Sequence, residues 1–113
     1  MKIDSATLKI NDLTWTVKKV SPDSKYLNLE DGSAYGVTYI HSLTIYIQNS
    51  ELSKDLYYRF LKHELTHAYI FSYHRSKAKW NEEDICELIE THADKIIEDA
   101  RWLVKVLFGY TVE

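Results

Sequence analysis

Two histidines and a glutamate stand close together within Arg59–Tyr73, a segment rich in apolar residues: His63, Glu64 and His67. Residues four positions apart lie on one face of an α-helix, so both imidazoles can reach the same ion. Zinc takes histidine nitrogens at about 2.0–2.1 Å, and Glu64 lies about 100° round the helix, beside the ion. There its carboxylate can take a proton from a zinc-bound water and later deliver it to a leaving amine. The spacing predicts Zn²⁺ as cofactor, His63 and His67 as ligands, and Glu64 as catalytic base.

A metal-free explanation of the same residues stays open. We expect the motif to lie inside the apolar arc of its helix, where each unpaired polar side chain costs roughly 1–3 kcal/mol. A hydrogen-bonded cluster of the two histidines and the glutamate would also satisfy these groups. Metal analysis of the protein purified without a histidine tag separates the two explanations.

The third zinc ligand has several candidates. A catalytic zinc site has three protein ligands and one open position, so one more side chain is needed. The segment that follows carries acidic residues at helical spacing, namely Glu83, Glu87, Glu90 and Asp94. Glu83 is much nearer the start of its helix than His67 is to the end of its own, so simple hairpin geometry favours a deeper residue. The pattern alone leaves Glu83, Glu87 and Glu90 open.

A family resemblance rests on two segments. HELTHA, His63–Ala68, resembles the active-site helix of thermolysin-like enzymes, and NEEDICE, Asn81–Glu87, resembles their third-ligand segment. The pairing is similar to the gluzincin metallopeptidases and to short phage and bacterial proteins of the ImmA/IrrE type. This resemblance implies Glu83 as the ligand beside His63 and His67, and Glu87 as a residue that orients a zinc histidine. ETHAD, Glu90–Asp94, fits the E-x-x-x-D part of the pattern as well.

The resemblance also implies a reaction, the zinc-dependent hydrolysis of a peptide bond. The partner would be a protein or peptide substrate, with a repressor of a phage or mobile element as one such substrate. A peptidase also needs a donor for the developing oxyanion. Larger gluzincins supply it from a downstream domain, whereas this chain ends soon after its second helix. The local candidates are Tyr69, Tyr73, His74 and His92, of which His92 is expected to be a core residue. The alternative is a zinc-binding interaction protein with little or no catalytic activity.

Hydrophobic periodicity indicates the elements that must position these residues. Alternation predicts strands at Leu13–Val20 and Leu43–Gln48, with weaker ones at Ala6–Ile10 and Ala34–His41. Turn residues occupy Ser21–Lys25 and Glu30–Ser33. Ser53 and Asn81 are candidate N-caps of two long helices, the first reaching about Tyr73 and the second ending at Gly109.

These elements predict one α+β domain over residues 1–113. A small antiparallel sheet of three or four strands is followed by two long packed helices on one face of it, a minimal zincin-like arrangement. Leu43–Asn49 directly precedes the first helix and is a candidate edge strand for a bound peptide, although a plain sheet strand is the simpler interpretation.

Composition limits the partners and the compartment. The formal charge of −3 argues against a general nucleic-acid binder, which would carry a basic face. Cys86 is the single cysteine, so no internal disulfide can form. Neither a membrane span nor an apolar leader stands out, and we expect a cytoplasmic protein without a membrane partner. The sequence does not define the oligomeric state.

Overall fold

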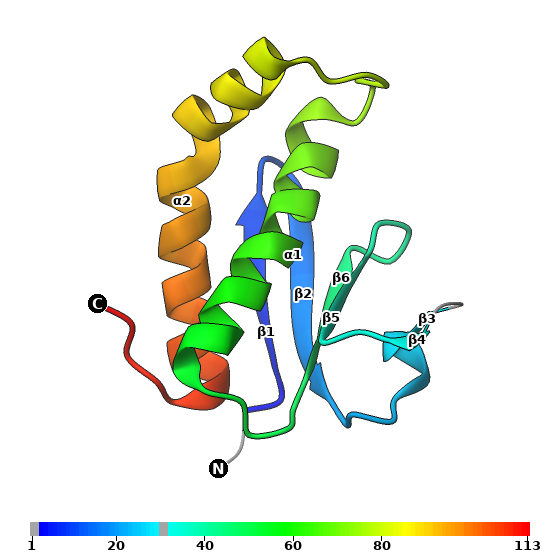
Figure 1. The fold of residues 1–113 in the computed structure, drawn as a ribbon, viewed down its shortest axis with the longest axis vertical. Coiled ribbons are helices and arrows are strands. Elements are labelled where there is room, and N and C mark those ends of the chain that lie inside the picture. Colours follow the sequence, from blue (N-terminus) through cyan, green and yellow to red (C-terminus); the bar gives the residue numbers. More distant parts are fainter. Residues whose placement is uncertain (1–2, 30–31) are drawn as a thin grey trace.

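The computed structural model describes residues 3–29 and 32–113. The turn predicted at Glu30–Ser33 therefore falls partly outside the described residues. The elements, in chain order, are β1 (Ser5–Ile10), β2 (Leu13–Val20), a short 3-10 helix (Lys25–Leu27), β3 (Asn28–Leu29), β4 (Gly32–Ser33), β5 (Gly36–Tyr39), β6 (Thr44–Gln48), α1 (Lys54–His74) and α2 (Glu82–Phe108). Figure 1 shows α1 crossing one face of the sheet and α2 lying alongside α1. The predicted α+β fold, a small sheet of three or four strands followed by two helices, is confirmed, with four strands in the main sheet.

Local signals place both helices where the sequence predicts them. The Ser53 side chain accepts a hydrogen bond from the Leu56 backbone N–H at the start of α1. At the start of α2, Asn81 and Asp84 form a capping box, in which each side chain accepts from the other residue's backbone N–H. Gly109 ends α2 with a left-handed φ of 76°, a conformation that glycine adopts without steric cost.

The direction of strand pairing differs from the prediction, because the sheet is mixed rather than wholly antiparallel. Its strand order is β1-β2-β6-β5, and β2 pairs with β6 in parallel, with Val17 opposite Ile45. Alternating hydrophobicity fixes which face of a strand is buried but carries no information on direction. Residues 21–43 separate β2 from β6, and a connection of this length permits parallel pairing.

The edge-strand interpretation of Leu43–Asn49 is wrong. β6 lies between β2 and β5, and all five of its residues are buried. The simpler interpretation, a plain strand inside the sheet, is correct. Within the described residues, β5 pairs on one side only, with β6, so β5 is the sheet edge nearest α1.

One hydrophobic core joins the sheet to both helices. Its buried members come from β1 and β2 (Ile10, Trp15, Val17), β6 (Ile45, Ile47), α1 (Tyr57, Leu61, Leu65, Ala68, Tyr69) and α2 (Ile96, Ala100, Leu103, Val104, Leu107). Trp15 also donates a buried hydrogen bond from its indole N–H to the Ser72 hydroxyl, at 2.9 Å. This contact ties β2 to the last turns of α1, which carries the histidine motif. No helix in the described ranges is long and apolar enough to cross a lipid bilayer.

Candidate active site

The two motif histidines lie next to one another on α1, as their spacing predicts. Their ring centroids are 5.0 Å apart. Both line a pocket of about 500 Å³ between α1 and β5, together with Glu64 and Thr38. Thr66, on the same helix, donates from its hydroxyl to the Lys62 carbonyl of the preceding turn at 2.7 Å. The helix thus presents two imidazoles to one concave surface.

The burial of the motif differs from the prediction. His63 and His67 are exposed, with 69% of the His63 side chain accessible, whereas the Glu64 side chain is only 10% accessible. The histidines therefore lie at the margin of the apolar arc, where water can hydrogen-bond to them. Burial alone does not require a metal here, and the case for one rests on the spacing, the shared pocket and the carboxylate beside it.

Glu64 is fixed by β5. The Thr38 hydroxyl donates to Glu64 Oε1 at 2.8 Å, and Glu64 Oε2 lies 4.0 Å from His63 Nε2. The Glu64 carboxylate is therefore held with one oxygen bonded to the strand and the other near the histidine. A buried carboxylate with one anchored oxygen has few orientations available, which suits a group that must take a proton in one direction.

Gly36 makes this approach of strand and helix possible. A Cβ at Gly36 would lie 2.9 Å from Ile47 Cδ1 and 3.1 Å from Glu64 Cγ, closer than normal contact. Sequence reasoning assigned no role to Gly36 or Thr38. A signal for the first was present, because an isolated glycine inside a strand pattern often marks close approach of another group. Nothing in the sequence marks Thr38.

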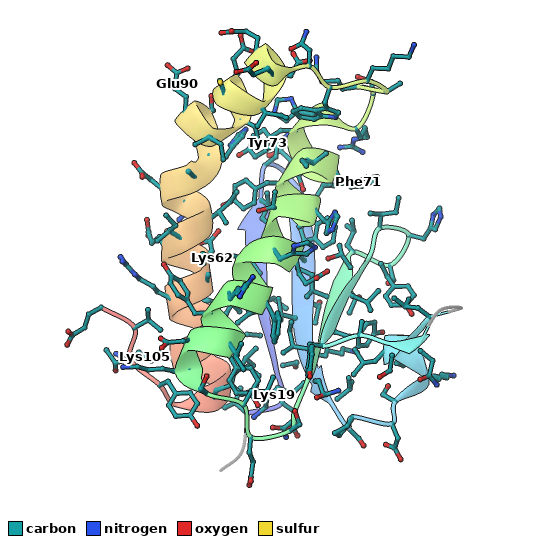
Figure 2. The ribbon with its side chains drawn as sticks, in the orientation of Figure 1. Lys19, Lys62, Phe71, Tyr73, Glu90 and Lys105 are labelled. Carbon is teal, nitrogen blue, oxygen red and sulfur yellow. The ribbon has the colours of Figure 1, made fainter. Side chains whose placement is uncertain are left out.

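The acidic residues predicted as third ligand lie apart from the histidines. Glu83, Glu87 and Glu90 are exposed on α2, and Figure 2 shows Glu90 pointing away from α1. Within the described ranges, no three His, Cys, Asp or Glu side chains form a group that could hold a metal ion. The structure therefore does not bring Glu83, Glu87 or Glu90 together with His63 and His67, and the assignment of the third ligand stays a prediction.

The packing of α1 explains this separation. α2 packs against the side of α1 that carries Tyr69 and Tyr73, through contacts with Asp99 and His92. At 100° per residue, Tyr69 lies about 200° round α1 from His67. The histidines consequently face β5, and α2 lies on another side of the helix.

The helix–helix contact also bears on the candidate oxyanion donors. Tyr69 donates to Asp99 Oδ2 at 2.6 Å, and burial, followed by this hydrogen bond, raises the pKa of Tyr69. Its hydroxyl is therefore engaged on the α2 side, and neither Tyr69, Tyr73 nor His92 lines the histidine pocket. His74 does line it, at the end away from Glu64. His92 is buried, as predicted, against the Tyr73 ring at 4.5 Å.

The His74–His92 contact predicts a pH dependence of stability. Burial, and then the charge of His74, lowers the pKa of His92 below its ordinary 6.5. The Nε2 atoms of His74 and His92 lie 3.4 Å apart, and the rings of Tyr69 and Tyr73 also pack against His92. The fold favours neutral His92, so its contribution is complete above about pH 6.5 and is lost as pH falls through the lower folded-state pKa.

We expect the melting temperature of the wild type to fall between about pH 7 and pH 5 more steeply than that of His92→Gln. The measurement is thermal unfolding in metal-free buffer at matched ionic strength. Because other groups titrate in the same range, the informative quantity is the difference between the two curves. Parallel curves would contradict the prediction.

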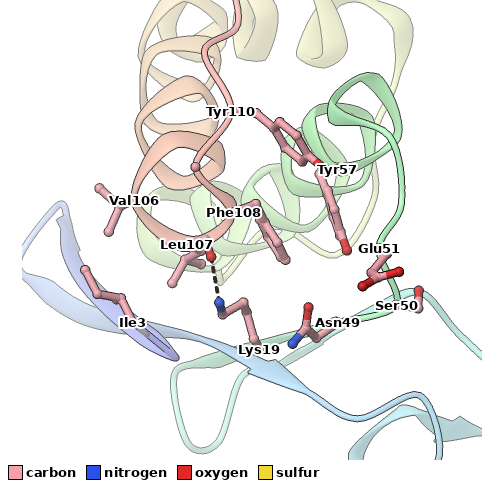
Figure 3. Close-up of a pocket in the computed structure, with 11 residues that line it drawn as sticks. Ile3, Lys19, Asn49, Ser50, Glu51, Tyr57, Val106, Leu107, Phe108 and Tyr110 are labelled. Carbon is pink, nitrogen blue, oxygen red and sulfur yellow. Dashed lines mark hydrogen bonds between the residues drawn. The ribbon is translucent and has the colours of Figure 1, made fainter. Parts of the chain in front are cut away.

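A second, larger pocket of about 710 Å³ lies near the end of α2 (Figure 3). Lys19 lines this pocket, and its side-chain amine donates to the Leu107 carbonyl at 2.7 Å, at the negative end of the α2 dipole. The Tyr57 ring stacks on Phe108 at 3.7 Å, and Glu51 is the one carboxylate among the lining residues. No histidine or cysteine lines this pocket. The pocket beside His63 and His67 is therefore the stronger candidate for chemistry.

Comparison with known proteins assigns this chain to no family. No protein-family model, no curated protein sequence and no solved structure matches it. The functional argument therefore rests on the residues of the α1–β5 pocket themselves.

Proposed function

We propose that the chain is a zinc-dependent metallopeptidase that hydrolyses a peptide bond in a protein substrate. The observation that carries this proposal is the arrangement of His63, Glu64 and His67. The two imidazoles lie with ring centroids 5.0 Å apart on the wall of a pocket, and the carboxylate between them in sequence is anchored by Thr38. Two imidazoles that can bind a metal and one oriented carboxylate that can act as base are two of the components that metal-assisted hydrolysis requires.

The donor atoms present fit part of a zinc site. His63 and His67 would hold the metal, since imidazole nitrogen is a preferred zinc ligand. They are exposed to the pocket, which leaves room for water and substrate. The gluzincin resemblance adds Glu83 as third ligand. Because α2 lies on another side of α1, coordination by Glu83 would require the first turns of α2 to move.

The reaction follows from what the residues of the pocket can do. Zinc, when bound, lowers the pKa of water and polarises the carbonyl of the scissile bond. Glu64 Oε1 accepts from Thr38, which leaves Oε2 to take the proton of the attacking water. Glu64 then delivers that proton to the nitrogen of the departing amine. Thr38 keeps the carboxylate aimed at the pocket throughout.

The edge of the sheet supplies a place for the peptide backbone. The Gln48 N–H donates to the Tyr35 carbonyl just before β5, and the next residues along the two chains, Gly36 and Ile47, lie opposite each other as a pair without mutual hydrogen bonds. By alternation, Gly36 and Thr38 turn their backbone N–H and C=O groups away from β6. Both residues also line the pocket. An extended substrate can therefore pair with β5 beside Glu64.

An interaction protein that binds zinc but has little activity is the second candidate. It is favoured by the one observation that the predicted acidic ligands are not gathered around the histidines. Zinc binding without cleavage of any peptide, folded or unfolded, would support this function over the peptidase. A cytoplasmic location and a phage or mobile-element repressor as substrate are further parts of our proposal, and they rest on composition and resemblance.

We expect the untagged protein to carry about one zinc ion per chain. The two adjacent imidazoles are the reason, and elemental analysis with protein quantification is the measurement. The preparation should be dialysed against a weak chelator first, so that loosely bound metal is removed. A zinc content far below one equivalent, after zinc has been offered, would remove the basis for the peptidase.

A further inference from the structure

The histidine pocket continues along α1 in both directions from Glu64. A second hollow of about 420 Å³ is lined by Tyr35, Arg59 and Phe60. It shares Gly36, His63 and Glu64 with the pocket of about 500 Å³ described above. The two hollows therefore meet at the proposed catalytic carboxylate. We call the combined surface the α1–β5 groove.

Both ends of this groove carry cations. Arg59 lines one end, and Arg75 and Lys77 line the other. Among the lining residues that belong to the described ranges, 3–29 and 32–113, Glu64 at the centre is the single carboxylate. The chain as a whole has a formal charge of −3, so the cationic ends of the groove contrast with the net charge of the protein.

The positive charges of Arg59 and Arg75 are not compensated by any described carboxylate nearby. In the described part of the chain, neither Arg59 nor Arg75 lies within 4.0 Å of a carboxylate. Arg75 instead holds its guanidinium 5.0 Å from the centre of the Phe71 ring. Lys77 is paired with Asp84 at 3.0 Å. Because part of its charge is already compensated, Lys77 should attract a ligand carboxylate less strongly than Arg75 does. A carboxylate in the groove would therefore not have to displace a described acidic side chain from either arginine.

Apolar side chains separate the cations from the catalytic centre. Ile70 and Phe71 line the groove between His67 and Arg75, with Ile40 among the residues opposite. On the other side of Glu64, the Tyr35 and Phe60 rings stack with centroids 4.8 Å apart. Such a surface fits apolar side chains next to the scissile bond, and acidic side chains only further out.

The distances between these residues along α1 can be compared with the length of an extended peptide. From His67 to Arg75 the helix advances about 12 Å, and from Arg59 to His63 about 6 Å. An extended peptide advances about 3.3 Å per residue. Arg75 is thus three to four peptide residues from the catalytic centre on one side, and Arg59 about two residues on the other.

We propose that the α1–β5 groove takes an extended acidic peptide, with apolar residues at the scissile bond and carboxylate side chains reaching Arg59 at one end and Arg75 and Lys77 at the other. This substrate class rests on the proposed peptidase function for its cleavage, but not for its binding. The backbone of the peptide pairs with Gly36 and Thr38 on β5, and its charges fix the register of the scissile bond against Glu64.

Binding of synthetic peptides to zinc-loaded Glu64→Gln protein tests this proposal without interference from cleavage. The probe is a fluorescent peptide of about eight residues with an apolar centre and glutamates toward both ends, compared with its glutamine counterpart. We expect the acidic peptide to bind about tenfold more tightly at low salt, since each exposed ion pair contributes a few-fold at most. We expect added salt to remove this difference.

Charge-neutralising variants locate the effect. Arg75→Gln combined with Lys77→Gln should weaken binding of the acidic peptide by a few-fold, as should Arg59→Gln alone, and all three substitutions together should bring the acidic peptide to the affinity of the neutral one. Lys79→Gln is the matched control. Like Arg75 and Lys77, Lys79 lies in the segment between α1 and α2, but it does not line the groove. All four residues are exposed, and equal melting temperatures would show that each variant is folded.

Equal affinity for the acidic and neutral peptides would overturn the proposal, as would no binding of either. An effect of Lys79→Gln as large as that of Arg59→Gln would overturn it too, because it would mean that the peptide responds to the overall charge of the protein and not to the cations of the groove. Charge-dependent binding by a wild type that never cleaves the peptide would refute the peptidase but support the groove. Cleavage of neutral peptides as fast as acidic ones would support the peptidase and refute this substrate class.

Discussion

Glu64→Gln should abolish peptide hydrolysis and leave the zinc content unchanged. Glutamine keeps the size of the side chain and can still accept from the Thr38 hydroxyl, but it cannot take a proton from water. Loss of a general base typically lowers the rate by about 10²–10⁴-fold. The measurement pairs elemental analysis of zinc with chelator-sensitive cleavage of an acidic peptide. Loss of zinc from this variant would mean that Glu64 is a ligand rather than the base.

Two further substitutions sharpen this test. Glu98→Gln removes an exposed carboxylate on α2, remote from the pocket, and should leave both zinc and activity as in the wild type. Thr38→Val keeps the shape of the side chain but removes the donor to Glu64 Oε1. Because Thr38 acts through Glu64, Thr38→Val should lower kcat with little change in KM and none in zinc content. A change in KM alone would instead assign Thr38 to substrate binding.

The parts of this protein that sequence reasoning predicted well depend on neighbouring residues. The caps of α1 and α2 at Ser53 and Asn81 follow from side chains that bond the first turn of their own helix. β2 has the bounds that its alternation indicates, Leu13–Val20. The proximity of His63 and His67 likewise follows from helix geometry alone. None of these features requires knowledge of how distant segments meet.

The parts that it missed depend on how distant segments meet. The parallel pairing of β2 with β6, and the place of β5 at the edge, are set by a long connection whose path the sequence does not encode locally. The acidic stripe on α2 has helical spacing, but spacing does not say which side of α1 receives α2. Tyr69 and Tyr73 decide this, because their contacts with Asp99 and His92 hold α2 away from the histidines.

Replacing either motif histidine should remove zinc without unfolding the protein. His63 and His67 are exposed, so His63→Ala and His67→Ala should change the stability of the metal-free protein by less than about 0.5 kcal/mol. A ligand at a hundred times its Kd stabilises the folded state by about 2.7 kcal/mol. Added zinc should therefore raise the melting temperature of the wild type. It should leave the melting temperatures of His63→Ala and His67→Ala unchanged. His41→Ala, an exposed histidine outside the pocket, should respond to zinc as the wild type does.

The same zinc-dependent melting, run on Glu83→Ala, Glu87→Ala and Glu90→Ala, tests the third ligand. Glu90 points away from α1 (Figure 2), and its variant should be silent. Loss of a protein ligand weakens metal binding far more than loss of a residue that orients one, which typically costs 10–100-fold. If Glu83→Ala abolishes the zinc response, the first turns of α2 must swing round α1 to the metal, because the metal-free arrangement places Glu83 apart from both histidines. If all three variants keep the response, water or substrate completes the coordination of His63 and His67, and the ligand implied by the gluzincin resemblance does not apply to this chain.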